Sequence, residues 1–171
     1  RSSRLFTWKN RKNKITEWKE KYPNSVPAKI ASAYFNIEYG WYIRGNGYSS
    51  SVDEKSFVFF RENVEKGKGE LLALDKETKT DPGWFSAMLE VALFQGWPQG
   101  EFDKLYFEAI EKYPEYLPLY FIKSAYMAPK WHGSTEELRI FIEDSVNNTR
   151  SIMGDELYAR LNWSSWNKKC S

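Results

Sequence analysis

Two segments of the sequence carry residue types that commonly recognise a ligand. The first is residues 41–48 (WYIRGNGY), in which we predict Trp41, Arg44 and Tyr48 as binding residues. The guanidinium of Arg44 could clamp a carboxylate or phosphate or stack on a ring, and the two glycines could offer backbone amides to an anion. The alternative is structural: Arg44 packs on Trp41, and the glycines end a helix.

The second segment is residues 130–134 (KWHGS), in which we predict Lys130, Trp131 and His132 as binding residues. Each segment is expected in a turn of its own helix pair, and equivalent turns of stacked helix pairs lie on the same edge. The two segments are therefore expected to be neighbours or to line one groove. The structural alternative for His132 is a capping or solvent-facing side chain beside a helix start.

The sequence offers little to a metal or a cofactor. It contains one histidine, His132, and one cysteine, Cys170, which cannot supply the usual ligands of a zinc site. A glycine-rich phosphate-binding loop is also missing from the sequence. We therefore expect no metal and no cofactor.

Acidic pairs in the sequence are explained by helix starts, where negative charge complements the helix dipole. These pairs are Asp53-Glu54, Glu136-Glu137 and Asp155-Glu156. Catalysis is therefore not the expected activity, and the G-x-S-x-G and His-Glu-x-x-His motifs are missing. The alternative is a helical enzyme acting on a glycan or similar polymer, with Glu38 or Glu90 as a general acid whose pKa an aromatic cleft would raise.

Aromatic residues are unusually frequent, with 8 Trp, 11 Tyr and 11 Phe against 27 Leu, Ile and Val together. Eight of them fall on apolar stripes of helical spacing and are predicted core residues: Tyr34, Phe35, Phe57, Phe60, Phe102, Tyr106, Phe121 and Phe141. Seven others fall at helix ends and turns and are predicted candidates for a binding surface: Trp41, Tyr42, Tyr48, Trp84, Trp97, Tyr116 and Trp131.

The periodicity of apolar residues predicts an all-α fold of seven or eight helices without significant sheet. We expect a single domain of residues 1–171, consisting of a basic N-terminal helix within 1–23, three antiparallel helix pairs within 24–147 and a capping helix within 148–171. Asp81-Pro82 and Ser134 with Glu137 are helix-start signals. The expected helices are 4–21, 26–43, 53–77, 82–97, 101–113, 117–128, 135–147 and 151–167, with a bend or break at Gly67 and Gly69.

An internal duplication relates residues 20–27 (EKYPNSVP) to residues 111–118 (EKYPEYLP) at an offset of 91. A spacing of 32 residues between Pro82 and Pro114, with Ala109 five residues before the second proline, resembles the tetratricopeptide repeat. The resemblance implies helix pairs stacked as a short solenoid. Its groove would hold a protein or peptide partner, which is the leading functional hypothesis.

A second, narrower resemblance rests on the W-x-x-R-G-x-G element of residues 41–47 and the P-K-W-H-G-S box of residues 129–134. Together they resemble a family of uncharacterised bacterial proteins with helical repeats, whose box has glycine where this chain has His132. The resemblance implies a tetratricopeptide-like fold and no activity. The sequence has no run of 18 apolar residues, so we expect a soluble protein. The sequence leaves the compartment unknown, with the bacterial cytoplasm and periplasm as the alternatives, and the start at Arg1 rather than Met suggests trimming.

Charge is distributed unevenly along the chain. Residues 1–21 carry a net charge of +6, and the remaining 150 residues carry −4. The basic N-terminal helix suggests nucleic acid or an anionic membrane as alternative partners. The structural alternative is a solvated helix face.

Overall fold

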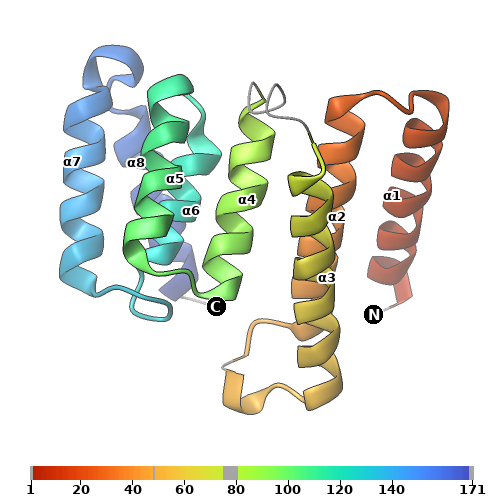
Figure 1. Ribbon diagram of the computed structural model, residues 1–171. Helices are drawn as coiled ribbons and strands as arrows, with labels where there is room; N and C mark the ends of the chain where they lie inside the picture. Colours follow the sequence, from red (N-terminus) through yellow and green to blue (C-terminus); the bar gives the residue numbers. More distant parts are fainter. Residues whose placement is uncertain (1, 48, 75–80, 170–171) are drawn as a thin grey trace. The chain divides into compact units, whose positions relative to one another are not determined.

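The computed structural model describes residues 2–47, 49–74 and 81–169, and it contains helices and no strands within those ranges. The described residues form eight α-helices, which are labelled in Figure 1, and a short 3-10 helix (Ser49–Ser51) precedes α3. The prediction of an all-α protein is therefore confirmed. The helices are α1 (Ser2–Lys21), α2 (Val26–Arg44), α3 (Glu54–Leu72), α4 (Pro82–Gln95), α5 (Gln99–Lys112), α6 (Leu117–Tyr126), α7 (Thr135–Met153) and α8 (Glu156–Lys169).

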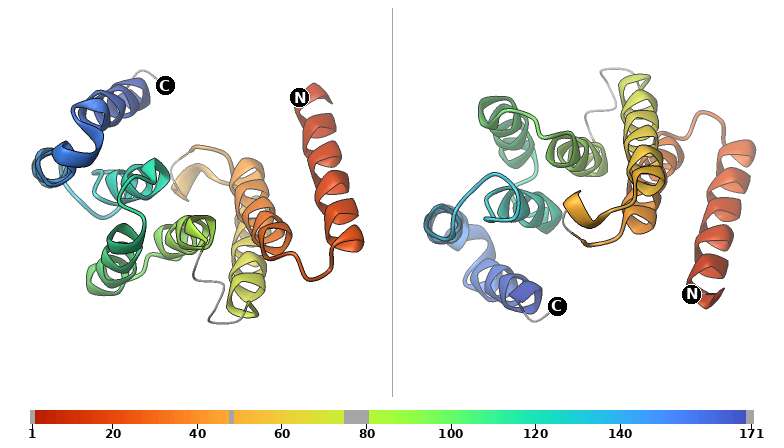
Figure 2. Two further views of the ribbon diagram at one scale, coloured as in Figure 1. Left: turned by 90° about the horizontal axis from the view of Figure 1, so that it is seen from above. Right: turned by 90° about the horizontal axis from the view of Figure 1, so that it is seen from below.

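The helices form two compact units, Arg1–Gln95 and Gly96–Ser171. In the first unit, α2 lies between α1 and α4 and packs along α3 (Figures 1 and 2). In the second unit, α6 packs against α5, α7 and α8, and α7 packs against α8. The two helices of the predicted pair 82–97 and 101–113 therefore belong to different units, α4 to the first and α5 to the second.

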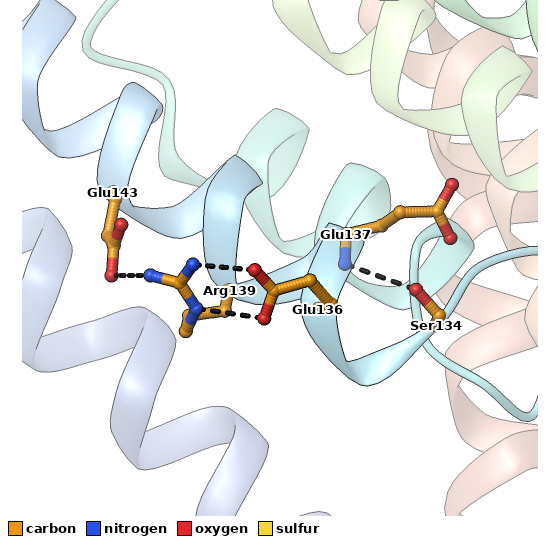
Figure 3. Close-up of polar contacts among 5 residues, drawn as sticks. All are labelled: Ser134, Glu136, Glu137, Arg139 and Glu143. Carbon is orange, nitrogen blue, oxygen red and sulfur yellow. Dashed lines mark hydrogen bonds and ion pairs between the residues drawn. The ribbon is translucent and has the colours of Figure 1, made fainter.

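Helix starts follow the predicted capping signals. The carboxylate of Asp81 accepts a hydrogen bond from the Gly83 amide at 2.7 Å, and α4 begins at Pro82. The Ser134 hydroxyl accepts from the Glu137 amide at 3.2 Å at the start of α7 (Figure 3). These bonds satisfy first-turn amides that have no partner inside the helix. The acidic pairs of the sequence lie at the starts of α3, α7 and α8, as the helix dipole favours.

The exposed face of α7 carries a ladder of charges. Arg139 lies between Glu136 and Glu143, with nitrogen–oxygen distances of 2.6 and 2.5 Å (Figure 3). The hydrogen bonds from Arg139 lower the pKa of Glu136. Pairs of this spacing support the helix locally and are common on solvated faces.

The predicted interruption at Gly67 and Gly69 is wrong, because α3 continues through both residues to Leu72. Gly67 is buried against α2, where a Cβ atom would lie 2.6 Å from Ile37 Cγ1 and 2.8 Å from the Ala33 carbonyl oxygen. Gly67 thus allows the two helices to approach closely. The packing gained there offsets the roughly 1 kcal/mol by which glycine disfavours a helix.

The duplicated sequence folds into the same turn twice. Helix α5 ends 91 residues after the end of α1, and helix α6 begins 91 residues after the start of α2. In the first turn the Ser25 amide donates to the Tyr22 carbonyl at 3.0 Å, and in the second the Tyr116 amide donates to the Tyr113 carbonyl at 3.1 Å. Each unit therefore contains one copy of this helix–turn–helix.

The predicted core aromatics lie inside the protein: Phe35, Phe60, Phe102 and Tyr106 are buried, and the other four are half-buried. The prediction that Trp84 belongs to a binding surface is wrong, because its side chain is buried at the start of α4. Its indole N–H donates to the Leu71 carbonyl at 3.1 Å, so it joins the end of α3 to α4. Within the part of the chain that the structure describes, every helix is too short or too polar to cross a membrane.

The second unit contains an ion pair whose lysine is buried and whose aspartate is partly exposed. Lys123 on α6, with a relative exposure of 5%, pairs with the carboxylate of Asp103 on α5. The ammonium lies 5.3 Å from the ring centres of both Phe102 and Tyr126. The aromatic faces and the carboxylate together compensate for the water that the cation has lost.

Candidate functional site

A pocket of about 520 Å³ opens in the first unit where α1, α2 and α4 meet. Four aromatic side chains and two carboxylic acids contribute to its lining. Two acids beside so many aromatic rings are an uncommon combination, because apolar surroundings disfavour the charged form of a carboxyl group. The lining residues are Trp8 of α1, Glu38, Trp41 and Tyr42 of α2, Gly45 and Asn46 after α2, and Glu90 and Phe94 of α4.

Helical spacing places these groups together. Glu38, Trp41 and Tyr42 are three and four residues apart on α2, and Glu90 and Phe94 are four apart on α4, so each set shares one face of its helix. Gly45 then ends α2 with a positive φ of 77°, and its amide donates to the Trp41 carbonyl at 2.9 Å. The chain consequently turns away at the edge of the pocket.

The aromatic side chains brace one another. The ring of Trp41 stacks on Phe94 with 4.8 Å between ring centres and 5° between planes. The ring of Trp8 lies 5.2 Å from Tyr42 and 5.6 Å from Phe35. Such rings present negative π faces, which attract cations.

Glu90 is the only ionisable side chain in the sequence of α4. Its Oε1 accepts a hydrogen bond from the Tyr34 hydroxyl at 2.7 Å. Burial raises the pKa of Glu90 to about 7; the bond from Tyr34 opposes this shift, and the charge of Glu38 adds to it. Near neutral pH this carboxyl group therefore exists in both its protonated and its charged form.

Glu38 binds a cation from α1. Its Oε2 lies 2.5 Å from Nη1 of Arg11, whose guanidinium is 5.4 Å from the ring centre of Trp8 and 6.0 Å from that of Phe35. The guanidinium is held by a carboxylate and by aromatic faces at the same time. Two of these side chains, Glu38 and Trp8, also line the pocket.

The predicted binding residues Trp41 and Arg44 come together in this unit. Trp41 lines the pocket, whereas Nη1 of Arg44 donates to the carbonyls of Gly45 and Gly47 at 2.9 and 3.1 Å. The Arg44 guanidinium also lies 4.7 Å from the Trp41 ring centre, and its burial lowers its pKa. These contacts are those of the structural alternative for Arg44. The third predicted residue, Tyr48, lies outside the described residues.

The other predicted residues lie in the second unit, in the turn between α6 and α7. The His132 amide donates to the Tyr126 carbonyl at 3.2 Å, and the two rings stack with centres 4.6 Å apart. Lys130 and His132 are exposed, and Trp131 is half-buried. The two predicted segments thus belong to different units, and a binding role for either stays a prediction.

The predicted binding set omitted most of the pocket. Glu38 and Glu90 entered the sequence argument only as possible catalytic acids, and Trp8 and Phe94 did not enter the set of candidate binding residues. A lone glutamate in the apolar segment 82–95 was the available signal, since an isolated buried charge is usually paired or functional. Trp8 gave no such signal, because its contribution depends on how α1 packs against α2.

Among the described residues there is no cluster of three or more His, Cys, Asp or Glu able to hold a metal ion. Comparisons with protein-family models, with curated proteins and with solved structures give no match.

Proposed function

We propose that the protein is a binding module for another protein or a peptide, and that the pocket of the first unit holds part of that partner. The observation that carries the proposal is a cavity of about 520 Å³ whose aromatic lining surrounds the carboxyl groups of Glu38 and Glu90. A pocket of this size, lined by aromatic rings and by polar groups in similar measure, is suited to receiving a polar or charged side chain.

The proposal extends to the helical scaffold. The eight packed helices and the twice-repeated turn support a tetratricopeptide-like arrangement of the kind found in the bacterial family that the sequence resembles. Trp41 would contact the partner in the pocket, and Arg44 and Tyr48, three and seven residues further along the sequence, would belong to the same binding segment. Lys130, Trp131 and His132 would form a separate contact on the second unit.

Peptide selection tests this function. Peptides selected from a random display library on the whole protein should bind an Asn46→Trp variant at least about tenfold more weakly, because a bulky ring at this exposed lining residue would fill the pocket. An Asn147→Trp variant, altered at an exposed residue of α7, is the matched control and should bind normally. Equal binding by the two variants, or failure to select any peptide, would contradict the proposal.

A second candidate function is hydrolysis of a glycan. The observation that favours it is the pKa of Glu90, about 7, which suits a general acid at neutral pH. Glu38 supplies the second carboxyl group that such enzymes use. Release of reducing ends from soluble polysaccharides should then be abolished by Glu90→Gln. Equal rates for the native protein and this variant, or no release by either, exclude this candidate.

A further inference from the structure

Arg11 shows how the first unit binds a cation. It belongs to α1, which packs against α2, and its guanidinium reaches the carboxylate of Glu38 over the face of Trp8. The ion pair is only partly screened by water, since the side chains of Arg11 and Glu38 are 44% and 33% exposed. Glu38 and Trp8 also line the pocket, so the recognition of Arg11 and the recognition of a ligand would share two side chains.

The charges around the pocket favour a cationic ligand. Glu38 and Glu90 line it, and the hydroxyl that hydrogen-bonds Glu90 is neutral. The guanidinium of Arg44 is engaged by two backbone carbonyls and by the Trp41 ring. Arg11 neutralises Glu38 in the structure, so a cationic ligand that displaces Arg11 would meet the Glu38 carboxylate together with Glu90 and the negative faces of the aromatic rings, whereas an anion would find no free cation among these groups.

We propose that the pocket binds a guanidinium group, supplied by an arginine side chain of the partner, and that Arg11 competes with this group for Glu38. The proposal rests on the proposed binding function and names the chemistry that it recognises. A planar guanidinium can stack on a ring and bond a carboxylate through two N–H groups, which a lysine ammonium cannot do. Arg11 already combines a carboxylate contact with a ring contact.

Binding of the guanidinium is coupled to Glu90. Tyr34 and Glu38 of α2 face this carboxyl group, and Arg11 of α1 pairs with Glu38. From α3, Glu65 and Lys68 hydrogen-bond Gln95, which is five residues further along α4. A cation beside Glu90 favours its charged form, so binding releases a proton. Affinity should therefore rise as the pH increases toward about 7 and level off above it.

Three small probes test the ligand chemistry on the whole protein: the N-acetyl amides of arginine, citrulline and lysine. Binding is followed by the shifts of the Trp indole N–H signals in NMR titrations. Arginine should bind at least about tenfold more tightly than citrulline, its neutral isostere, and more tightly than lysine. Equal binding of citrulline would show that charge is not recognised, and equal or tighter binding of lysine would overturn the assignment to guanidinium.

Two substitutions on α1 test the competition. Arg11→Ala should bind the arginine probe about three- to tenfold more tightly, because Glu38 is freed. Lys12→Ala removes the same charge from an exposed neighbouring residue and should leave the affinity unchanged. Thermal unfolding checks that both variants are folded, and Arg11→Gln replaces Arg11→Ala if the latter is not. Unchanged or weaker binding by the folded Arg11 variant overturns the competition.

The selected peptides and the small probes together distinguish guanidinium recognition from peptide binding in general. Selected peptides whose arginines can be replaced by citrulline without loss of affinity would overturn the guanidinium assignment and leave the peptide-binding function intact. Binding of the arginine probe without any selected peptide would support the guanidinium assignment and contradict the peptide-binding function. Glu38→Gln should weaken the arginine probe at least about tenfold and leave citrulline binding nearly unchanged; an equal loss for both probes counts against the proposal.

Discussion

Glu90 shows how much one residue can depend on its helix. The segment 82–95 is mostly apolar and Glu90 is its only ionisable residue, so packing of α4 removes the side chain from most of its water. The hydroxyl of Tyr34 compensates only in part, and the charge of Glu38 adds repulsion. The folded protein therefore favours the protonated form of Glu90 over a pH range in which an ordinary glutamate is charged.

Replacement of Glu90 should change how stability depends on pH. Its pKa is about 7 in the folded protein and near 4.5 when the chain is unfolded, so the folded state binds the proton more tightly. The free energy of unfolding should fall by about 3 kcal/mol relative to Glu90→Gln as the pH rises from 4.5 to above 7, since Gln cannot ionise. Urea denaturation of both proteins across this range measures the difference.

Glu136→Gln is the control for this measurement, because the Arg139 hydrogen bonds lower the pKa of Glu136. A lowered pKa stabilises the folded state above the unfolded pKa, and that contribution is lost as the pH falls. The difference from the native protein should therefore have the opposite slope to that for Glu90→Gln. Parallel curves for the native protein and Glu90→Gln would contradict the assigned environment of Glu90.

At the scale of elements, two glycines, which carry no Cβ atom, make the close contact between α2 and α3 possible. Gly67 on α3 faces Ile37 and the Ala33 carbonyl, and Gly40 on α2 faces Asn63 of α3, whose Cβ would lie 2.9 Å from a Cβ at residue 40. Each helix thus supplies one glycine where the other approaches. This close contact holds α2 in the position from which Glu38 and Trp41 enter the pocket.

Two glycine substitutions in α3 should have opposite effects. Gly67→Ala places a Cβ against Ile37 and a backbone carbonyl and should lower the free energy of unfolding by about 1–3 kcal/mol. Gly69→Ala has open space around it and should raise the free energy by about 0.5–1 kcal/mol through better helix propensity. Chemical denaturation of the two variants decides this; stabilisation by both would mean that the helices are not in close contact at Gly67.

At the scale of the whole molecule, the chain divides into two units with different interiors. The first gathers aromatic rings around two carboxyl groups, and the second surrounds the Lys123–Asp103 ion pair with aromatic rings. Each unit contains one copy of the duplicated turn. The two units thus share a local helix–turn–helix and differ in the polar groups inside them.

The division predicts additive effects of substitutions. Asp103→Asn leaves the buried Lys123 ammonium without its counter-charge and should destabilise the protein by about 3 kcal/mol. Because Glu90 has its described partners in the other unit, the Glu90→Gln/Asp103→Asn double variant should show the sum of the two changes within about 0.5 kcal/mol. Chemical denaturation of the four proteins measures this. Glu90→Gln with Tyr34→Phe, which share a hydrogen bond, is the non-additive control, and a similar coupling in both cycles would contradict the prediction.

Local features of the sequence predicted where most of the helices begin, although not that α3 continues through Gly67 and Gly69. The spacing of apolar residues, Asp81-Pro82 and Ser134 predicted most helix starts closely, and the repeated EKYP motif predicted two equivalent turns. Periodicity and capping involve residues within a few positions of one another, so their physical effects can be recognised without knowing the fold.

Only the tertiary structure decided which of these residues form a pocket. Arg11 and Glu38, Tyr34 and Glu90, and Trp41 and Phe94 are pairs that meet because α1, α2 and α4 pack together. The same dependence explains why Gly67 continues a helix and why Trp84 is buried. The sequence by itself determined the helices and their apolar faces; the pairing of those faces depends on contacts between distant segments, and it is this pairing that removes Glu90 from water and places aromatic rings around two acids.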